Sequence, residues 1–223
     1  MDERDEGIIL RVRPLTETSL IIVWLAREQG LISTVAKGAR RPKSTFIGKL
    51  DLYYAARFTF KRSRGSELHN LREVQLDATH EQLRHDLGWL NQAAYAGALI
   101  EHTSERETPL HEQYALLLEF LRELPKTAPT PATIFRLEIE LFELLGISPD
   151  LESARLSPVS KAIIVHLYNV GRSSIDISEP QVNEISHFLL GSIGEMNKRL
   201  YGIREAALRN NALNGKSRHD SFT

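Results

Sequence analysis

The first part of the chain alternates apolar and polar positions with a period of two. Between residues 50 and 61 the even positions are apolar or aromatic, whereas the odd positions include Asp51, Arg57 and Lys61. Side chains that alternate in this way lie on opposite faces of a β-strand. Related apolar runs lie at residues 8–13, 20–25, 31–36 and 68–74. The sequence therefore predicts about five short strands, with no long helix between most of them.

The period changes after Asp77, where apolar residues recur every three or four positions, as on one face of a helix. Helix-start signals mark five helices in this part of the chain, and the last helix is predicted to run toward Leu208. The signals are Thr79 with Gln82, Thr108-Pro109, Thr130-Pro131, Ser157-Pro158 and Ser178 with Gln181.

These two patterns predict an α+β protein of two domains. Residues 1–78 are expected to form a small five-stranded antiparallel barrel or sandwich, and residues 79–208 an all-helical domain. Residues 209–223 are polar and lack periodicity, so we expect a disordered tail there. The apolar stripes are expected to pack in the cores.

The composition excludes several kinds of chemistry. The chain has no cysteine, which removes disulfides, thiolate metal ligands and cysteine nucleophiles. Its histidines form no HExxH motif, and neither a GxSxG elbow nor a complete phosphate-binding loop occurs. We therefore expect no catalysis and no bound metal or cofactor. The acidic start and the lack of an apolar run of about 20 residues predict a cytoplasmic protein without membrane association.

Positive charge is concentrated in one segment of the chain. The formal net charge of the whole chain is −1, yet residues 37–64 hold nine Lys or Arg and a single acidic residue, Asp51. Concentrated cations are typical of a surface that binds a polyanion. The alternative interpretation is a solvated basic loop without a ligand.

We interpret these cations as parts of one groove on the barrel. The cations of the first and fourth strands are expected on the wet face, and the loop after the third strand adds four more. Such a groove would follow a phosphate backbone without reading its sequence. The predicted contact residues are Arg11, Arg13, Lys37, Arg40, Arg41, Lys43, Arg57 and Lys61.

Aromatic side chains would add base stacking to this groove if they are exposed. Trp24 is expected in the core, because its strand is apolar on both faces. Phe46 is expected to be exposed, and Tyr53 either packs in the core or stacks on a base.

The N-terminal residues resemble the RecO family of bacterial DNA repair proteins. The resemblance covers about the first 75 residues and continues more weakly through residues 144–151. It is carried by Gly7-Ile8-Ile9-Leu10-Arg11, Glu17-Thr18-Ser19, the segment Gly30-Leu31-Ile32-Ser33-Thr34-Val35-Ala36-Lys37-Gly38-Ala39-Arg40-Arg41, and Gly48-Lys49-Leu50.

The resemblance implies an N-terminal OB-fold, a helical domain and no enzymatic turnover. Proteins of this family bind single- and double-stranded DNA, anneal complementary strands and act as recombination mediators. The implied partners are DNA, RecR and the single-stranded DNA-binding protein, with a functional link to RecA and a location at the nucleoid. By the same resemblance, Lys37, Arg40 and Arg41 match the basic loop of the family.

Two features depart from the family pattern. Family members often hold zinc through cysteines after the segment that is Pro149-Asp150-Leu151 here, whereas this chain has no cysteine at all. The C-terminal part is only loosely similar to the family. Either a patch there receives the tail of the single-stranded DNA-binding protein, or it is simply charged helix surface. This patch would comprise Phe188, Lys198, Arg199, Leu200 and Arg204.

Two other functions remain open on the sequence. The chain is either an adaptor whose basic loop meets an acidic protein partner, or an OB protein that binds RNA. Pull-downs after nuclease treatment would identify the adaptor, and competition between matched DNA and RNA strands would identify the RNA-binding protein.

Overall fold

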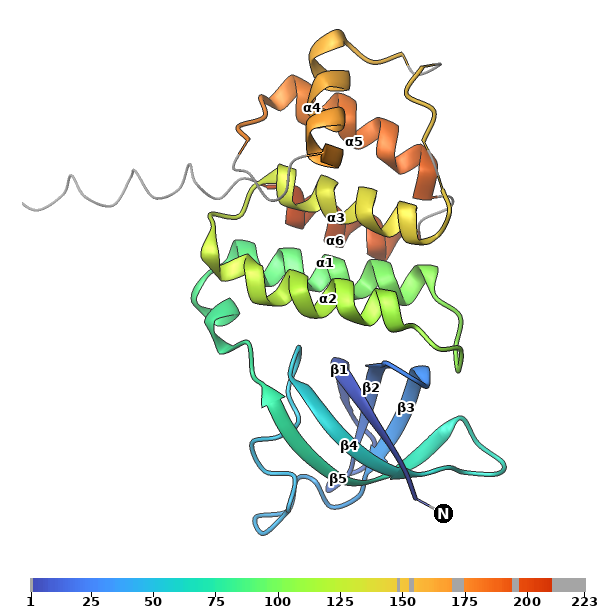
Figure 1. The fold of residues 1–223 in the computed structure, drawn as a ribbon. Helices are drawn as coiled ribbons and strands as arrows, with labels where there is room; N and C mark the ends of the chain where they lie inside the picture. The colour runs from blue at the N-terminus through green and yellow to red at the C-terminus, as the bar shows by residue number, and fades with distance from the viewer. Residues whose placement is uncertain (1, 148, 153–154, 170–174, 194–196, 210–223) are drawn as a thin grey trace, which may run out of the picture. The chain divides into compact units, whose positions relative to one another are not determined.

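The N-terminal part of the protein is a closed five-stranded barrel with the strand order β1-β2-β3-β5-β4 (Figure 1). The computed structural model describes residues 2–147, 149–152, 155–169, 175–193 and 197–209. The strands are β1 (Asp2–Pro14), β2 (Leu20–Ala26), β3 (Gly30–Ala36), β4 (Ala55–Lys61) and β5 (Leu68–Ala78). This order is that of an OB-fold, so the predicted fold class is confirmed.

The long strand β1 closes the barrel by pairing on both of its edges. Its first half pairs with β4 from Asp2 to Ile8, and its second half pairs with β2 from Gly7 to Pro14. Four of the five strand pairs are antiparallel, as predicted. The fifth pair, β3 with β5, is parallel, because the β4–β5 hairpin inserts β5 between β4 and β3.

Trp24 lies in the barrel core, as its apolar strand predicts. Its ring stacks on Phe58 with the ring centroids 4.2 Å apart, and both side chains are buried. The indole N–H donates to Thr34 Oγ1 at 2.8 Å. The one polar atom of the tryptophan therefore has a partner inside the core, as a buried donor requires.

The fourth strand begins later than the alternation predicts. β4 starts at Ala55, and Tyr53 adopts a positive φ of 65° in the turns before it. Its backbone N–H donates to Ile9 O at 2.8 Å, which holds this turned conformation against β1. Leu52 is consequently exposed and Tyr53 buried, so the predicted faces are reversed at these two positions.

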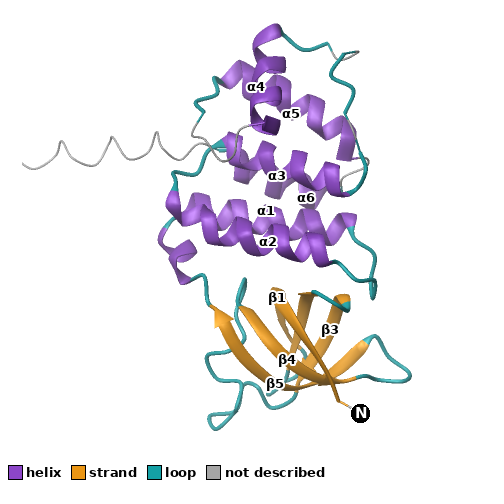
Figure 2. Cartoon of the chain, viewed as in Figure 1, coloured by secondary structure: helices purple, strands orange, loops and turns teal. Residues whose placement is uncertain are grey.

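Helices make up most of the described chain after the barrel (purple in Figure 2). They are η1 (Glu81–His85), α1 (Leu87–Thr103), α2 (His111–Glu123), η2 (Leu124–Lys126), α3 (Pro131–Leu144), α4 (Pro158–Asn169), α5 (Glu179–Ile193) and α6 (Lys198–Leu208). The prediction of a single last helix is wrong. The Asn197 side chain accepts the Leu200 N–H at 2.9 Å and caps α6 as a separate helix. The tail predicted to be disordered lies, beyond Arg209, outside the described residues.

The chain divides into two compact units. The first unit contains Met1–Glu81 and Gly97–Arg122, and the second contains the described parts of Gln82–Ala96 and Glu123–Thr223. Among the described residues, no helix is both long and apolar enough to cross a membrane.

In the first unit, the connector between α1 and α2 lies along the turn between β2 and β3. Glu107 N donates to Leu31 O at 3.4 Å, and Leu110 N donates to Arg27 O at 3.3 Å. Gly30, at the start of β3, approaches the connector so closely that a Cβ atom there would lie 1.9 Å from Thr108 O. The glycine therefore permits the close contact between connector and barrel.

Candidate nucleic-acid interface

The loop between β3 and β4 presents its cations from a series of tight turns. We call Lys37–Lys43 the basic loop. Arg41 N donates to Gly38 O, and Ser44 N donates to Arg41 O, each at 3.0 Å. Gly38 has a φ of 68°, a left-handed conformation that glycine adopts without steric cost. Ala39 is buried and belongs to the barrel core, so the loop is anchored while the charged side chains around it remain exposed.

The four cations of the basic loop are exposed. Within the part of the chain that the structure describes, no carboxylate lies within ion-pair distance of any Lys or Arg of this loop. Arg40 N donates to Thr18 O at 3.0 Å, and its guanidinium donates to Thr16 O at 3.4 Å. These bonds hold the loop against the β1–β2 turn. The charges are therefore available to an external anion.

The two predicted arginines of β1 have different surroundings. Arg13 is exposed and lies at the end of the barrel that carries the basic loop, because it pairs with Ile21, which in turn pairs with Val35. Arg11 instead forms an ion pair with Glu101 of α1, with Nη2 and Oε2 2.7 Å apart. Arg11 is partly exposed, so its role as a DNA contact stays a prediction, although its charge is already paired.

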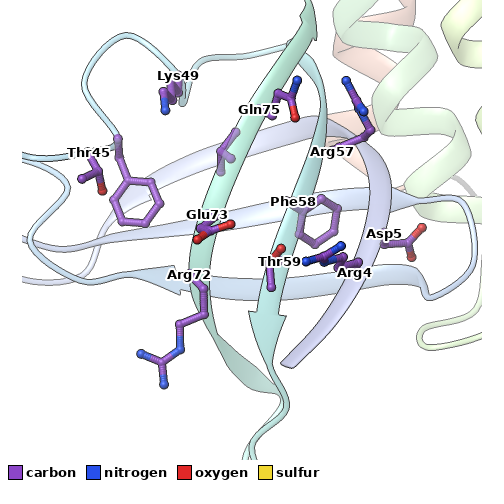
Figure 3. Close-up of a pocket in the computed structure, with 12 residues that line it drawn as sticks. Arg4, Asp5, Thr45, Lys49, Arg57, Phe58, Thr59, Arg72, Glu73 and Gln75 are labelled. Atoms are coloured by element: carbon purple, nitrogen blue, oxygen red, sulfur yellow. The ribbon is translucent and has the colours of Figure 1, made fainter. Parts of the chain in front are cut away.

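The outer face of β4 and β5 borders a groove of about 700 Å³, which we call the β4–β5 groove (Figure 3). Across the sheet, Arg4 of β1 pairs with Thr59 of β4, and Thr59 pairs with Glu73 of β5. The residues of the β3–β4 loop around Lys49 contribute further lining. The cations that line this groove are Arg4, Lys49, Arg57 and Arg72.

Sequence reasoning missed Arg4 and Arg72. Arg4 lies in the acidic start of the chain, which gave no clear alternation, although β1 extends back to Asp2. Arg72 has no partner in the β4–β5 register, because the pairing shifts between Glu73 and Leu71 on either side of it. A bulge of this kind breaks the period-two pattern, so the sequence offered no regular signal for this arginine.

The two predicted cations of β4 point outward, as the alternation indicates, but Lys61 does not lie beside the basic loop. Arg57 is exposed and pairs with Asp77 of β5 at 3.1 Å. Lys61 is also exposed, and in the register of the β1–β4 strand pair it lies opposite Asp2. Lys61 therefore lies at the end of β4 away from Ala55, whereas the chain from the basic loop enters β4 at Ala55.

The aromatic residues considered for base stacking are buried. Phe46 is 8% exposed and belongs to the barrel core, so the expectation that it is exposed is wrong. Tyr53 packs rather than stacks on a ligand, and burial raises its pKa to about 12. The β3–β4 loop contributes Ala39 and Phe46 to the barrel core, and Leu50 and Tyr54 pack against that core.

The patch predicted for a partner's tail is only partly on the surface. Lys198 and Arg199 are exposed at the start of α6, and Phe188 of α5 is half-buried. Leu200 and Arg204 are buried, so the expectation of a surface position is wrong for these two. Arg204 is buried because it forms an ion pair with Glu138 of α3. Tail docking at the exposed members of the patch stays a prediction.

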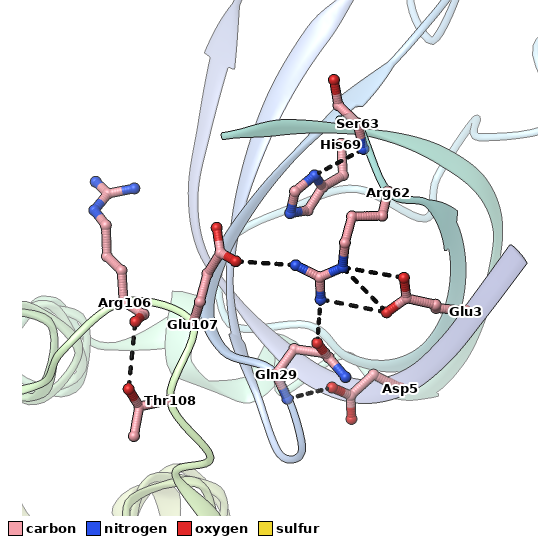
Figure 4. Close-up of polar contacts among 9 residues, drawn as sticks. All are labelled: Glu3, Asp5, Gln29, Arg62, Ser63, His69, Arg106, Glu107 and Thr108. Atoms are coloured by element: carbon pink, nitrogen blue, oxygen red, sulfur yellow. Dashed lines mark hydrogen bonds and ion pairs between the residues drawn. The ribbon is translucent and has the colours of Figure 1, made fainter. Parts of the chain in front are cut away.

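A second polar cluster lies where β4 ends (Figure 4). The Arg62 guanidinium donates to Glu3 at 3.0 Å, to Glu107 at 2.9 Å and to the Gln29 side chain. These contacts join the start of β1, the β2–β3 turn and the α1–α2 connector. Arg62 is thus a structural cation, and its guanidinium is already occupied by protein groups.

His69 lies beside this cluster and is almost completely buried. Its ring stacks on Phe60 with the centroids 5.6 Å apart, and its Nδ1 accepts the Ser63 N–H at 3.3 Å. Burial lowers the pKa of His69, and the nearby charge of Arg62 acts in the same direction. Among the described residues, no group of three or more acidic or histidine side chains is placed to hold a metal ion.

Comparison with known families agrees with this geometry. The barrel defines the chain as an OB-fold protein with a cationic loop. The family description "Recombination protein O N terminal" matches residues 1–80, and "Recombination protein O C terminal" matches residues 84–156. The chain belongs to the recombination protein O, or RecO, family.

Several curated relatives carry the name DNA repair protein RecO. The protein from Symbiobacterium thermophilum is 32% identical over 147 residues, which are 66% of this chain and 57% of that protein. The protein from Gloeothece citriformis is 33% identical over 173 residues, 75% of this chain and 60% of the relative. The protein from Bacillus subtilis is 27% identical over 146 residues, 66% and 56% respectively. The chain thus spans less than two thirds of the length of these relatives.

Proposed function

We propose that the chain is a non-enzymatic DNA-binding mediator of DNA repair and recombination. It binds the phosphate backbone of single- and double-stranded DNA and anneals complementary strands. The observation that carries this proposal is the basic loop, with four exposed cations and no carboxylate among the described residues within ion-pair distance. A surface of this kind attracts a polyanion and releases its counterions. Membership of the RecO family supports DNA as that polyanion.

Annealing follows from backbone contact without base contact. Lys and Arg side chains neutralise phosphates and lower the repulsion between two strands, while the bases stay available for pairing. In the cell, RecR and the single-stranded DNA-binding protein are the proposed partners, and loading of RecA on coated strands is the proposed outcome. The exposed Lys198 and Arg199 are the proposed contacts for an acidic tail.

A salt titration tests the electrostatic mechanism. If about five phosphates are neutralised, log K for a labelled single strand should fall with log salt at a slope of about −3.5, from roughly −0.7 per phosphate. Substitution of Arg40→Ala with Arg41→Ala should weaken binding to every sequence alike and make the slope shallower by about 1.4. The matched control is Arg155→Ala with Arg209→Ala, two exposed cations outside the barrel.

Four results would contradict the proposal. A slope near zero would exclude phosphate neutralisation, and loss restricted to particular sequences would exclude backbone recognition. Lack of oligonucleotide binding, together with capture of an acidic protein after nuclease treatment, would identify an adaptor instead. A clear preference for RNA over a matched DNA strand would identify an RNA-binding protein.

A further inference from the structure

We infer that the β4–β5 groove is a second phosphate-backbone site, which holds one single strand of DNA while the basic loop holds another. This inference rests on the proposed function and adds to it a second DNA strand and the place where that strand binds. The groove is lined by residues of β1, β4, β5 and the β3–β4 loop. Of its four cations, only Arg57 was among the predicted contact residues.

The cations of the groove are largely unneutralised. Arg57 is paired with Asp77 at 3.1 Å. Among the described residues, no carboxylate lies within ion-pair distance of Arg4, Lys49 or Arg72. Arg4 and Arg72 are exposed, and Lys49 is half-buried. Three cations of the groove can therefore contact phosphates without first breaking an ion pair.

Two carboxylates line the groove, and they differ in their effect on an anion. Asp5 is buried, and its oxygens accept the backbone N–H groups of Glu6 at 2.7 Å and Gln29 at 2.8 Å. These donors offset part of its negative charge. Glu73 is exposed and opposes an anion directly. With four cations against two carboxylates, the lining still carries a net positive charge of two.

The groove and the basic loop lie on different sides of the same connection. The basic loop is hydrogen-bonded to the β1–β2 turn through Arg40, whereas the later part of the β3–β4 loop, with Thr45 and Lys49, lines the groove beside β4 and β5 (Figure 3). Phe46, which follows Thr45 and also lines the groove, is inserted in the barrel core. One barrel therefore offers two cationic surfaces that can be occupied independently.

The lining of the groove favours a backbone over a base. Its aromatic residues, Phe46 and Phe58, are 8% and 2% exposed and offer no free ring face for stacking. The exposed groups are the arginine cations, polar side chains such as Thr45 and Gln75, and the Glu73 carboxylate. A strand bound through its phosphates would keep its bases directed away from the protein, which is what pairing with a second strand requires.

Stoichiometry distinguishes one site from two. The probe is a labelled oligothymidylate of about eight nucleotides, short enough to occupy a single site. Native mass spectrometry of the full chain at low salt counts oligonucleotides per protein in each complex. We expect two per chain for the unchanged protein and one for Arg40→Ala with Arg41→Ala. We also expect one for Lys49→Ala with Arg72→Ala, and none when all four substitutions are combined.

The number of bound oligonucleotides shows whether the second site alone fails or whether the proposed function fails with it. One oligonucleotide per unchanged chain, lost on substitution of the basic loop alone, would overturn the second site and leave the proposed function intact. No bound oligonucleotide would overturn both. The control Arg155→Ala with Arg209→Ala should retain two, and a loss there would show that any reduction of net charge suffices and would overturn the assignment to the groove.

A substitution that strengthens binding is a useful further test, because a misfolded variant would lose binding and would not gain it. Glu73→Gln deletes the exposed carboxylate of the groove, so it should raise the affinity for the second oligonucleotide several-fold and speed annealing of complementary strands. In the Lys49→Ala with Arg72→Ala background, where only one oligonucleotide is expected, the same change should not restore the second. Unchanged or weaker binding of the second oligonucleotide by Glu73→Gln would overturn the inference.

Discussion

The Arg204 guanidinium forms a two-pronged ion pair with the Glu138 carboxylate inside the second unit. Nε lies 2.6 Å from Oε1 and Nη2 lies 2.9 Å from Oε2, and both side chains are fully buried. The Tyr95 hydroxyl donates to the same carboxylate at 2.5 Å, and Arg204 also donates to Ser186. One buried network thus joins α1, α3, α5 and α6, with its charged groups hydrogen-bonded to one another.

Removing one partner of this pair should be far more damaging than removing both. Arg204→Met leaves the Glu138 carboxylate buried without its cation and should lower the free energy of unfolding by about 3–5 kcal/mol. Glu138→Leu should have a comparable effect. The double variant should lose clearly less than the sum, because neither charge is left alone. Urea unfolding followed by circular dichroism measures all three, and strictly additive losses would contradict this account.

The indole N–H of Trp24 donates to the Thr34 hydroxyl in the barrel core. Thr34→Val keeps the shape of the side chain and removes the acceptor, so the buried N–H loses its hydrogen bond. We expect a loss of about 1–3 kcal/mol in unfolding free energy. Thr59→Val, at a half-exposed position of β4, is the matched control and should stay within about 0.5 kcal/mol of the unchanged protein. Equal losses would argue against the buried donor as the cause.

Alanine substitutions at Gly30 and Gly48 would distinguish the cost of backbone strain from the cost of a steric clash. Both have left-handed φ angles, 67° and 72°, so alanine at either position should cost about 1–2 kcal/mol. At Gly48 the added Cβ would meet no atom within 4 Å, whereas at Gly30 it would lie 1.9 Å from Thr108 O. Gly30→Ala should therefore destabilise the protein clearly more than Gly48→Ala in thermal unfolding. Similar losses would show that the connector yields without cost.

His69 should make the first unit less stable in mild acid. Its pKa is lower in the folded protein than the ordinary value of 6.5, because burial disfavours the charged ring. Its contribution to stability is therefore complete above the unfolded pKa and is lost as the pH falls through and below it. His69→Gln should flatten the decline in unfolding free energy between about pH 7 and about pH 5. The pKa of His80 is also lowered by burial, so part of the decline should remain.

A pH dependence that is unchanged in His69→Gln would assign the decline to other groups. Glu184 does not compete in this window, because hydrogen bonds from Ser160 and Ser157 lower its pKa below the usual carboxyl value. Asp5 acts in the opposite sense, since burial raises its pKa and its protonated form is the one that the fold favours.

The strands and most helices could be predicted because their signals are local. The alternation that places Phe58 and Phe60 inside and Arg57 outside is set by the pleat of one strand. The helix starts at Thr130-Pro131 and Ser157-Pro158 depend on a few adjacent residues. Such signals need no knowledge of distant parts of the chain.

The errors concern residues whose surroundings come from elsewhere in the sequence. The sequence places Arg204 on a helix surface. In the structure it bonds to Glu138, which lies 66 positions earlier in the chain. The sequence places Arg11 on the wet face of its strand but gives no sign of its ion pair with Glu101 of α1. Phe46 lies in a polar loop, and only closure of the barrel reveals the apolar site that it fills. The contacts of these residues could therefore not be predicted from the sequence alone.

The two apolar anchors of the β3–β4 loop, Ala39 and Phe46, affect the strength of the proposed polyanion binding. A flexible arm would have to surrender backbone freedom each time it closed on a phosphate. Here that freedom is already lost when the barrel folds, because both anchors are embedded in its interior. The proposed binding of a polyanion would thus depend on hydrophobic packing, and we expect a change that loosens the interior to weaken that binding while leaving every charge in place.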